Sequence, residues 1–458
     1  MKDSLSLKFS GKKVLVVGLG ISGIWTARWL KKQGAVVTVS EIKPETELNP
    51  NACKEVQALG IELEAGGHQK STFLNTELIV LSPGVHNDIE LLGAARMMNI
   101  PITGELELAS RLTDTPMIAV TGTNGKSSVT AFLGSLLKNA NLKVFVGGNI
   151  GTPLMAYIAG EEKADFVVVE VSSFQLDTIE TFCPFVSIVL NISPDHLDRY
   201  ASYEDYAQSK LRIFMNQRPG QYVILNDDDE RLSTVRPSSG VSVFRFGTKK
   251  KEGRHAFIEG SKMMADIPGK EGNRFSLQSF RLPGTHNLEN LLAVVLAGVT
   301  LGIENRVIQQ TIGELRGLPN RLERVRELAG VAFYNDSKAT NIDAAVRAVL
   351  SFDRPVILIA GGRHKGETYA RLVRASDGIV KGAVFLGESR ELLARSFKGV
   401  VPFSMAEDME EAVSVAFSQA VSGDAVLLAP ACSSFDMYSD YAHRGRAFKA
   451  AVERLSCG

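Results

Sequence analysis

The segment TGTNGKS at residues 121–127 carries the clearest chemical signal in this chain. It follows the apolar run 118–120 and precedes a segment with helical apolar spacing, which is the strand–turn–helix setting of a phosphate-binding loop. In such a loop backbone N–H groups hold phosphates, Lys126 reaches the β- and γ-phosphate oxygens, and the Ser127 hydroxyl ligates Mg²⁺. The glycine that the full pattern places at position 120 is Val120 here. The pattern predicts ATP and Mg²⁺ binding without a strict Walker-type hydrolytic switch.

A second glycine-rich turn, GLGISG at residues 18–23, follows the apolar run 14–17 and opens another helix. Glycines at this spacing let the backbone approach a pyrophosphate lying on the helix N-terminus. Glu41 follows about 20 residues on, where a dinucleotide site holds a ribose hydroxyl. Three interpretations remain open from these residues alone: an NAD site, a turn that needs glycine only for packing, and a site for another nucleotide-diphosphate conjugate.

Two acid- and histidine-bearing segments also follow apolar runs. Glu170 ends the run 166–169, and His196 lies in the segment DHLDR (195–199) after the run 187–190. The carboxyl ends of parallel strands are where doubly wound sheets bind ligands, so Glu170 is a candidate Mg²⁺ ligand and His196 a candidate metal or phosphate contact. Without a phosphate-binding loop, each would be interpreted as an ordinary strand-end acid or a structural histidine. Composition gives no reason to single out Lys210, which lies on an amphipathic helix.

Four further polar segments could contact ligands. GTHNLEN (284–290) opens a long apolar helix and offers amides suited to a nucleobase edge. Segments 334–341, 361–366 and 430–441 each follow a buried strand, so they are expected to meet at one edge of a third sheet. Any one of them could be an ordinary polar loop, but together they predict a site for a small polar, anionic ligand.

The elements that must position these residues form an α/β protein. Short β-branched runs alternate with helical segments throughout the chain, which predicts parallel, doubly wound sheets buried on both faces. We expect three domains: a Rossmann-like N-terminal domain (1–106), a central P-loop ATPase-like domain with a parallel sheet (107–317), and a C-terminal Rossmann-like domain (318–458). The polar stretch 249–273 is expected to form an exposed hairpin or insertion in the central domain.

Composition excludes several classes of protein. The 458 residues include 51 Lys and Arg against 51 Asp and Glu, so the zero net charge disfavours a nucleic-acid binder. The chain is 45% hydrophobic and 22% charged, as in a globular protein with an ample core. Four cysteines without a regular framework (Cys53, Cys183, Cys432 and Cys457) favour a reducing compartment. No segment resembles an export signal or a membrane span, so the sequence predicts a cytoplasmic protein.

Taken together, the motifs resemble those of the Mur ligase family, ATP-dependent amide-forming enzymes of bacterial peptidoglycan assembly. The resemblance rests on TGTNGKS, on DHLDR with Lys210 downstream, on GTHNLEN and on LPNRLE (318–323). Folylpolyglutamate synthases share much of this core. The segments NDSKATN (335–341) and PACSSFDMY (430–438) are similar to the D-glutamate-adding branch of the Mur ligases.

The resemblance implies that ATP phosphorylates the carboxylate of UDP-N-acetylmuramoyl-L-alanine to an acyl phosphate, which the amine of D-glutamate then attacks. It implies that residues 121–127 (Thr121, Gly122, Thr123, Asn124, Gly125, Lys126 and Ser127) hold the ATP phosphates. It implies catalytic roles for Lys126, Glu170, His196 and Lys210, with Mg²⁺ held by Ser127, Glu170, His196 and a carbamylated Lys210. The adenosine part of ATP is assigned to Asn287, Asn290, Arg321 and Asp336. The substrates are assigned to Gly20, Ile21, Ser22, Glu41, Lys43, Asn149, Lys338, Thr340, Lys365, Ser434 and Tyr441.

Two alternative functions stay open at this point. A nicotinamide-dependent dehydrogenase would use residues 18–23 and Glu41 but would leave Lys126 and Ser127 without a purpose. A folylpolyglutamate synthase-like ligase would use the phosphate-binding loop but would not carry a nucleotide-sugar glycine turn ahead of it. Under either ligase interpretation we expect a monomer that binds small molecules and neither nucleic acid nor a membrane.

Overall fold

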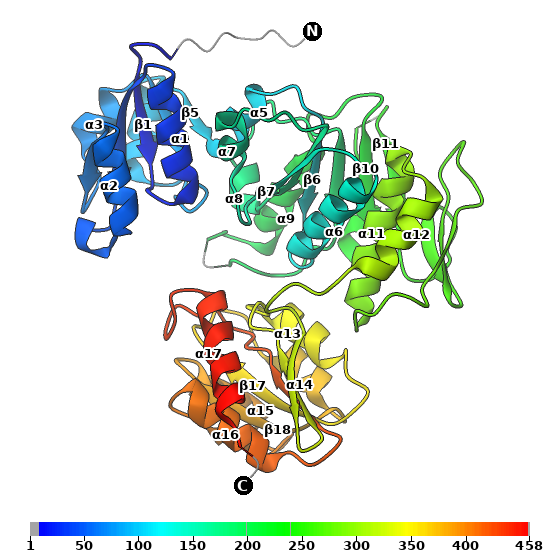
Figure 1. The fold of residues 1–458 in the computed structure, drawn as a ribbon. Helices are drawn as coiled ribbons and strands as arrows, with labels where there is room; N and C mark the ends of the chain where they lie inside the picture. Colours follow the sequence, from blue (N-terminus) through cyan, green and yellow to red (C-terminus); the bar gives the residue numbers. More distant parts are fainter. Residues whose placement is uncertain (1–8, 198, 239, 457–458) are drawn as a thin grey trace.

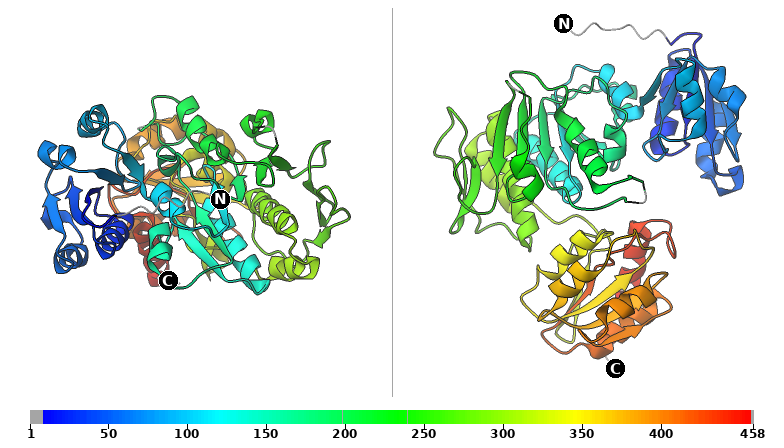
Figure 2. Two further views of the ribbon diagram at one scale, coloured as in Figure 1. Left: turned by 90° about the horizontal axis from the view of Figure 1, so that it is seen from above. Right: turned by 180° about the vertical axis from the view of Figure 1, so that it is seen from behind.

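The computed structural model describes residues 9–197, 199–238 and 240–456, and these contain three sheets covered by helices (Figures 1 and 2). Alternate residues of the central strands belong to different apolar clusters. Val14 and Val16 pack into one cluster and Leu15 and Val17 into another. Strands buried on both faces are therefore confirmed. Asp198 and Cys457, which the sequence analysis included, lie outside the described residues.

The first sheet has the strand order β3-β2-β1-β4-β5, and all of its pairs are parallel. Its order is that of a Rossmann-like half, as predicted, with the glycine turn following the central strand β1. Its strands are β1 (Lys13–Val17), β2 (Val36–Glu41), β3 (Glu62–Ala65), β4 (Leu78–Leu81) and β5 (Ile102–Gly104). The helices around it are α1 (Ile21–Lys32), the 3₁₀ turn η1 (Glu45–Glu47), α2 (Pro50–Ala58), α3 (Lys70–Leu74), α4 (Glu90–Met97) and α5 (Glu105–Arg111).

The second sheet has the order β14-β13-β12-β11-β10-β9-β6-β8-β7. Strands β9, β6, β8 and β7 are neighbours and parallel, so their carboxyl ends meet at one edge. The strands are β6 (Met117–Thr121), β7 (Val144–Gly148), β8 (Phe166–Glu170), β9 (Val186–Val189), β10 (Tyr222–Asn226), β11 (Ser242–Phe246), β12 (Ala256–Glu259), β13 (Lys262–Ala265) and β14 (Arg274–Ser276). The helices are α6 (Lys126–Asn139), α7 (Leu154–Ala159), α8 (Ser173–Leu176), α9 (Tyr203–Leu211), the 3₁₀ turn η2 (Arg212–Phe214), α10 (Glu230–Thr234), α11 (Thr285–Leu301) and α12 (Asn305–Glu314).

The third sheet has the order β15-β16-β20-β17-β18-β19. Its neighbouring strands β16, β20 and β17 are parallel, whereas the edge strand β15 is antiparallel to β16. The strands are β15 (Glu323–Leu328), β16 (Val331–Asn335), β17 (Val356–Gly361), β18 (Val380–Leu386), β19 (Phe403–Met405) and β20 (Ala425–Leu428). The helices are α13 (Ile342–Val349), α14 (Ala370–Ser376), α15 (Arg390–Phe397), α16 (Met409–Gln419) and α17 (Tyr441–Arg454).

The polar stretch 249–273 differs in part from the prediction. It does form an antiparallel hairpin of β12 and β13, with β14 adding a further antiparallel strand. It is not fully exposed, because Met263 and Ala265 are fully buried in the apolar cluster that also contains α11. The apolar residues of β13 form a run of only three, Met263 to Ala265, within a stretch of charged and glycine residues, so little in the sequence indicates a buried face.

Among the described residues no helix combines the length and the apolar character that a membrane span requires. Cys53, Cys183 and Cys432 are free thiols. The domain boundaries at residues 106 and 317 remain predictions.

Glu107 on α5 joins the N-terminal part of the chain to the central sheet. Its buried carboxylate accepts backbone N–H groups of Glu180, Thr181 and Phe182 at 2.9–3.0 Å and pairs with Arg111. Burial alone would raise the pKa of Glu107, but these hydrogen bonds lower it. The contribution to stability is therefore present above the unfolded-state pKa and is lost as the pH falls through the folded-state value.

We predict that Glu107→Ala lowers the free energy of unfolding by about 3–5 kcal/mol, because it removes the buried carboxylate that pairs with Arg111 and accepts three backbone N–H groups. Denaturant titration at neutral pH measures the loss. Glu180→Ala is the matched control, since Glu180 pairs with the same arginine but its side chain is 64% exposed and should contribute less than about 1 kcal/mol. Equal effects of the two variants would contradict the prediction.

Candidate active site

The phosphate-binding loop lies where the sequence places it, between β6 and α6. Gly125 is the N-cap of α6 and has φ +87°, a left-handed conformation that disfavours other residues. A side chain there would also collide with the Asn290 amide of α11. Glycine at position 125 therefore lets the loop turn into the helix and lets α11 approach it.

Lys126 and Ser127 form the first turn of α6; Lys126 is half-buried and Ser127 is buried. The Lys126 ammonium donates to the backbone carbonyls of Gly122 and Thr123 at 2.9 and 3.0 Å. Burial lowers the pKa of Lys126. Ser127 Oγ accepts a hydrogen bond from the Arg321 guanidinium at 2.7 Å, although Arg321 is 194 residues away in sequence. Two cationic side chains thus converge on the loop from different domains.

Glu170 lies at the end of β8, which is the neighbour of β6, and is 3% exposed. Its Oε1 accepts from the Asn149 side chain at 3.0 Å. Burial would raise the pKa of Glu170, but the charge of Lys126 lowers it, so the carboxylate is ionised. Its Oε2 is buried and has no hydrogen-bond partner among the described residues. An ionised oxygen without a donor fits a cation ligand.

His196 and Lys210 lie beside this carboxylate and line the same cavity. Burial lowers the pKa of His196 to about 4, so the imidazole is neutral and has a free electron pair for a cation. Lys210 is 2% exposed; its ammonium donates to the Gly122 carbonyl at 3.0 Å and lies over the Tyr206 ring. Burial, reinforced by the charge of Lys126, lowers the pKa of Lys210 well below its ordinary value.

These residues fit Mg²⁺ that shares its coordination with phosphates. Among the described residues no group of three or more His, Cys, Asp or Glu side chains is arranged to hold a metal by itself. Mg²⁺ is commonly bound through one or two carboxylates together with water and substrate phosphates. The unpaired Glu170 oxygen next to the phosphate-binding loop matches that pattern.

A cavity of about 680 Å³ lies between the central sheet and the third sheet. The central domain lines it with the phosphate-binding loop, Glu170, His196 and Lys210, and the C-terminal segments line the other side. The latter contribute the predicted residues Lys338, Thr340, Lys365, Ser434 and Tyr441. Strands β16, β20 and β17 are neighbours, so the predicted meeting of three loops at one sheet edge is confirmed.

Two lysines of the C-terminal domain contact other side chains in the cavity. Lys365 forms an ion pair with Asp195 at 2.9 Å across the domain boundary. Burial would raise the pKa of Asp195, but the charges of Lys365 and His196 and the hydrogen bonds from Asn341 and Lys365 together lower it. Lys338 lies over the Tyr441 ring at 3.9 Å, and burial lowers its pKa to about 7. The remaining hydroxyl groups, on Thr340 and Ser434, face the same cavity.

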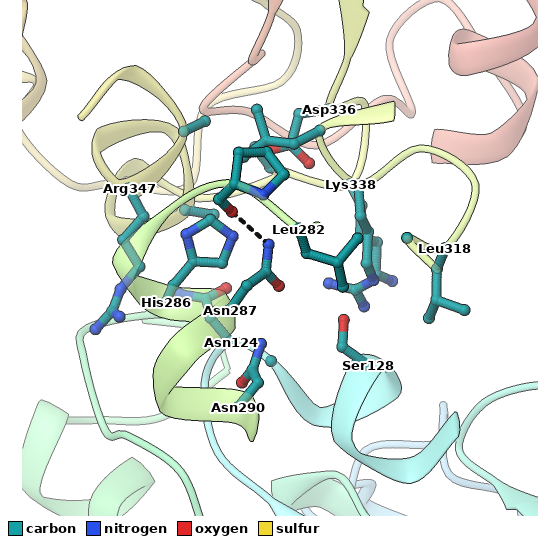
Figure 3. Close-up of a pocket in the computed structure, with 18 of the residues that line it drawn as sticks. Asn124, Ser128, Leu282, His286, Asn287, Asn290, Leu318, Asp336, Lys338 and Arg347 are labelled. Atoms are coloured by element: carbon teal, nitrogen blue, oxygen red, sulfur yellow. Dashed lines mark hydrogen bonds between the residues drawn. The ribbon is translucent and has the colours of Figure 1, made fainter. Parts of the chain in front are cut away.

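A second cavity, of about 480 Å³, adjoins the first and lies between α11 and the third sheet (Figure 3). All four residues assigned to adenosine line it: Asn287, Asn290, Arg321 and Asp336. The Asn287 side chain donates to the Pro283 carbonyl at 2.6 Å, and burial raises the pKa of Asp336 to about 7. Asn124, Gly125, Arg321 and Lys338 line both cavities, so the two are continuous at the phosphate-binding loop.

The glycine turn of the first sheet lies apart from these two cavities. Gly20 is the N-cap of α1, no side chain caps it, and Ile21 is 64% exposed. Glu41 accepts the backbone N–H of Leu19 at 2.8 Å and that of Lys43 at 3.2 Å, so the end of β2 is tied to the turn. Ser82 donates to the Gly18 carbonyl at 2.9 Å. An open helix N-terminus beside these loops suits a diphosphate.

Several residues at the site escaped the sequence analysis. His286 and Arg347 line the second cavity, and Asn341 donates to Asp195 at 2.9 Å. Asp195 precedes His196 in the segment DHLDR, and Asn341 follows Thr340 in the segment NDSKATN. These neighbouring positions could have identified both as site residues. Thr121, by contrast, is buried and donates to the Val171 carbonyl at 2.8 Å, which joins β6 to the end of β8.

Family comparisons agree with this arrangement. Residues 12–104 match the Mur ligase MurD-like N-terminal domain, residues 120–298 the Mur ligase middle domain, and residues 320–432 the Mur ligase glutamate ligase domain. A UDP-N-acetylmuramoylalanine–D-glutamate ligase from Geotalea daltonii is 40% identical over 99% of each chain. A ligase of the same name from Pelotomaculum thermopropionicum is 41% identical over 98% of this chain and 99% of its own.

Solved structures show the same three-domain fold. The UDP-N-acetylmuramate-alanine ligase from Thermotoga maritima has a TM-score of 0.62 at 21% identity and covers 96% of this chain and 99% of its own. A pseudomurein peptide ligase from Methanothermus fervidus has a TM-score of 0.62 at 20% identity, covering 97% and 100%. The full-length relatives favour neither the dehydrogenase nor the folylpolyglutamate synthase alternative. The chain belongs to the Mur ligase family.

Proposed function

We propose that this chain joins D-glutamate to UDP-N-acetylmuramoyl-L-alanine, with conversion of ATP to ADP and phosphate. The observation that carries the proposal is the 680 Å³ cavity in which a phosphate-binding loop faces Lys365, Thr340 and Ser434. D-Glutamate brings two carboxylates, for which cationic and hydroxyl donors are suitable partners. Relatives that match over their full length carry the name of this activity.

The reaction consists of two transfers. A substrate carboxylate oxygen attacks the γ-phosphorus of ATP, the bond to the ADP oxygen breaks, and an acyl phosphate results. The D-glutamate amine then attacks the acyl carbon, and the tetrahedral intermediate expels phosphate as the amine loses a proton. Positioning and charge account for most catalysis in phosphoryl transfer, which explains why no nucleophilic side chain is needed.

We assign the roles as follows. Lys126 and the loop N–H groups hold the phosphates, Asn287, Asn290, Arg321 and Asp336 hold the adenosine part, and Asn149 contacts the muramoyl substrate. Gly20, Ile21, Ser22, Glu41 and Lys43 hold the UDP moiety. Lys338, Thr340, Lys365, Ser434 and Tyr441 receive the substrates. When bound, Mg²⁺ supplies positive charge to the transferring phosphoryl group, and Ser127, Glu170, His196 and a carbamylated Lys210 are the side chains proposed to hold it.

The test is an ADP-release assay with UDP-N-acetylmuramoyl-L-alanine and ATP, in which D-glutamate, L-glutamate, L-lysine and diaminopimelate are offered in turn. We expect release only with D-glutamate. Release with L-lysine or diaminopimelate instead would overturn the substrate assignment while leaving the ligase chemistry in place.

We further propose that the protein is cytoplasmic and monomeric. ATP and nucleotide sugars are cytoplasmic substrates, and sedimentation analysis tests the oligomeric state.

We predict that Lys365→Ala raises the KM for D-glutamate roughly tenfold to a hundredfold with little change in the KM for ATP, since a charge-assisted contact contributes ~1.5–3 kcal/mol. Steady-state kinetics with each substrate varied gives the two constants. Lys398→Ala, which removes an exposed lysine of the same domain, is the control. A defect confined to ATP would place Lys365 at the nucleotide.

A further inference from the structure

The first turn of α13, in the C-terminal domain, touches the phosphate-binding loop of the central domain. The side-chain amide of Asn124 donates to the Asp343 carboxylate at 3.0 Å and lies 3.5 Å from the side-chain oxygen of Asn341. Within its own domain the backbone of Asn124 is held by Asn191, through bonds of 2.8 and 3.1 Å. Asn124 is therefore hydrogen-bonded to residues of both domains.

Asp343 is held in place independently of Asn124. Its carboxylate accepts from Arg347 and from Arg371, both at 2.9 Å and both in the C-terminal domain. Arg347 also forms an ion pair with Glu289 on α11 at 2.9 Å, which is a second contact with the central domain. Asp343 is 5% exposed, and its position is set by its ion pairs with the two arginines. A carboxylate fixed in this way can orient the side chain that donates to it.

The contact lies between the two cavities described above. Asn124 lines both cavities, and Arg347 lines the smaller one (Figure 3). Glu289 also lines the smaller cavity. The segment that carries Asp343 directly follows Lys338 and Thr340, which line the larger cavity. One contact of 3.0 Å thus joins the domain proposed to receive D-glutamate to the loop proposed to hold the ATP phosphates.

We propose that Asp343 is a positioning residue through which the C-terminal domain orients the phosphate-binding loop, so that binding of D-glutamate and binding of ATP favour each other. The inference rests on the proposed function. Coupling of this kind is reciprocal, because each ligand must change the affinity of the other by the same factor. It needs no contact between Asp343 and either ligand.

The experiment measures that factor directly. Affinity for a non-hydrolysable ATP analogue with Mg²⁺ is measured by calorimetry, in the presence of UDP-N-acetylmuramoyl-L-alanine, with and without saturating D-glutamate. In the unaltered protein we expect D-glutamate to tighten analogue binding by roughly fivefold or more, within the usual range for coupled sites. In Asp343→Ala the factor should fall towards one, and in Asp343→Asn, which keeps an acceptor oxygen for Asn124, it should be partly retained.

A double-mutant cycle separates positioning from a general loss of structure. Asn124→Ala and Asp343→Ala should be non-additive in analogue affinity, because each removes the same contact. Glu410→Ala, which breaks the exposed Arg454–Glu410 pair of the same domain, should leave the coupling factor unchanged. If Asp343→Ala does not fold, as judged by its melting transition, Asn124→Ala alone removes the contact from the other side.

The outcomes distinguish this inference from the proposed function. No ADP release by the unaltered protein with D-glutamate overturns the function. An active protein in which the coupling factor is one, or in which Asp343→Ala lowers the melting temperature but keeps the coupling factor, overturns the role of Asp343 and leaves the function intact. Additive effects in the cycle likewise overturn it.

Discussion

Lys126→Ala is expected to reduce phosphate release by about 1,000-fold to 100,000-fold, the range in which a single cation stabilises phosphoryl transfer. The ammonium lies in the first turn of α6, hydrogen-bonded to the loop carbonyls and near the ionised Glu170, and no other side chain of that turn is cationic. Binding of the UDP-sugar substrate should persist, because the glycine turn proposed to hold UDP belongs to the first sheet. Coupled ADP-release kinetics and calorimetry with the UDP-sugar give the two quantities.

Lys138→Ala is the matched control, since Lys138 is an exposed lysine in the last turn of the same helix. It should keep near-normal activity and the same substrate affinity. If Lys126→Ala lost affinity for the UDP-sugar as well as activity, the assignment of the two ligands to different domains would be wrong.

The parts of the site that the sequence predicted are those fixed by local pattern. Glu170 ends a buried strand, the loop 121–127 and His196 come at or after the ends of two others, and parallel strands that are neighbours bring such residues to one edge. The same argument brought the three C-terminal loops together. The sequence pattern does not determine the order of the strands within a sheet. It therefore predicts that these residues lie at the same sheet edge, but not which side chains are in contact.

The parts that escaped prediction are contacts between domains. Asp343 and Arg347 are four residues apart on α13, a spacing that usually marks an exposed helical ion pair. In the structure the pair is mostly buried and reaches Asn124, 219 residues away. The family resemblance assigns Lys365 to the substrate, and no local pattern indicates its ion pair with Asp195, 170 residues away. Such pairs depend on how two separately folded sheets are oriented, and no local periodicity encodes that orientation.

The environment of Lys210 favours the neutral amine over the ammonium. It is buried, its ammonium has a backbone carbonyl and an aromatic ring as neighbours, and Lys126 lies close enough to lower its pKa further. A plain ammonium here would be repelled by a cation at Glu170. A neutral amine, by contrast, can add CO₂ with release of a proton, which converts the cation into a carboxylate-like anion. Burial therefore favours the form of Lys210 that carbamylation requires.

We expect Lys210→Ala to lose activity by about 100-fold, since ~3 kcal/mol is the upper range for one charge-assisted contact. Acetate or formate should restore part of the activity by supplying a carboxylate to the vacated space, whereas methylamine should not. Gln208→Ala, an exposed position on the same helix α9, should behave like the unaltered protein with and without these additives. Rescue by methylamine would show that the lysine acts as a cation. Near-normal activity of Lys210→Ala would show that the side chain is only structural, because a buried lysine that serves packing alone would leave the rate of phosphoryl transfer unchanged.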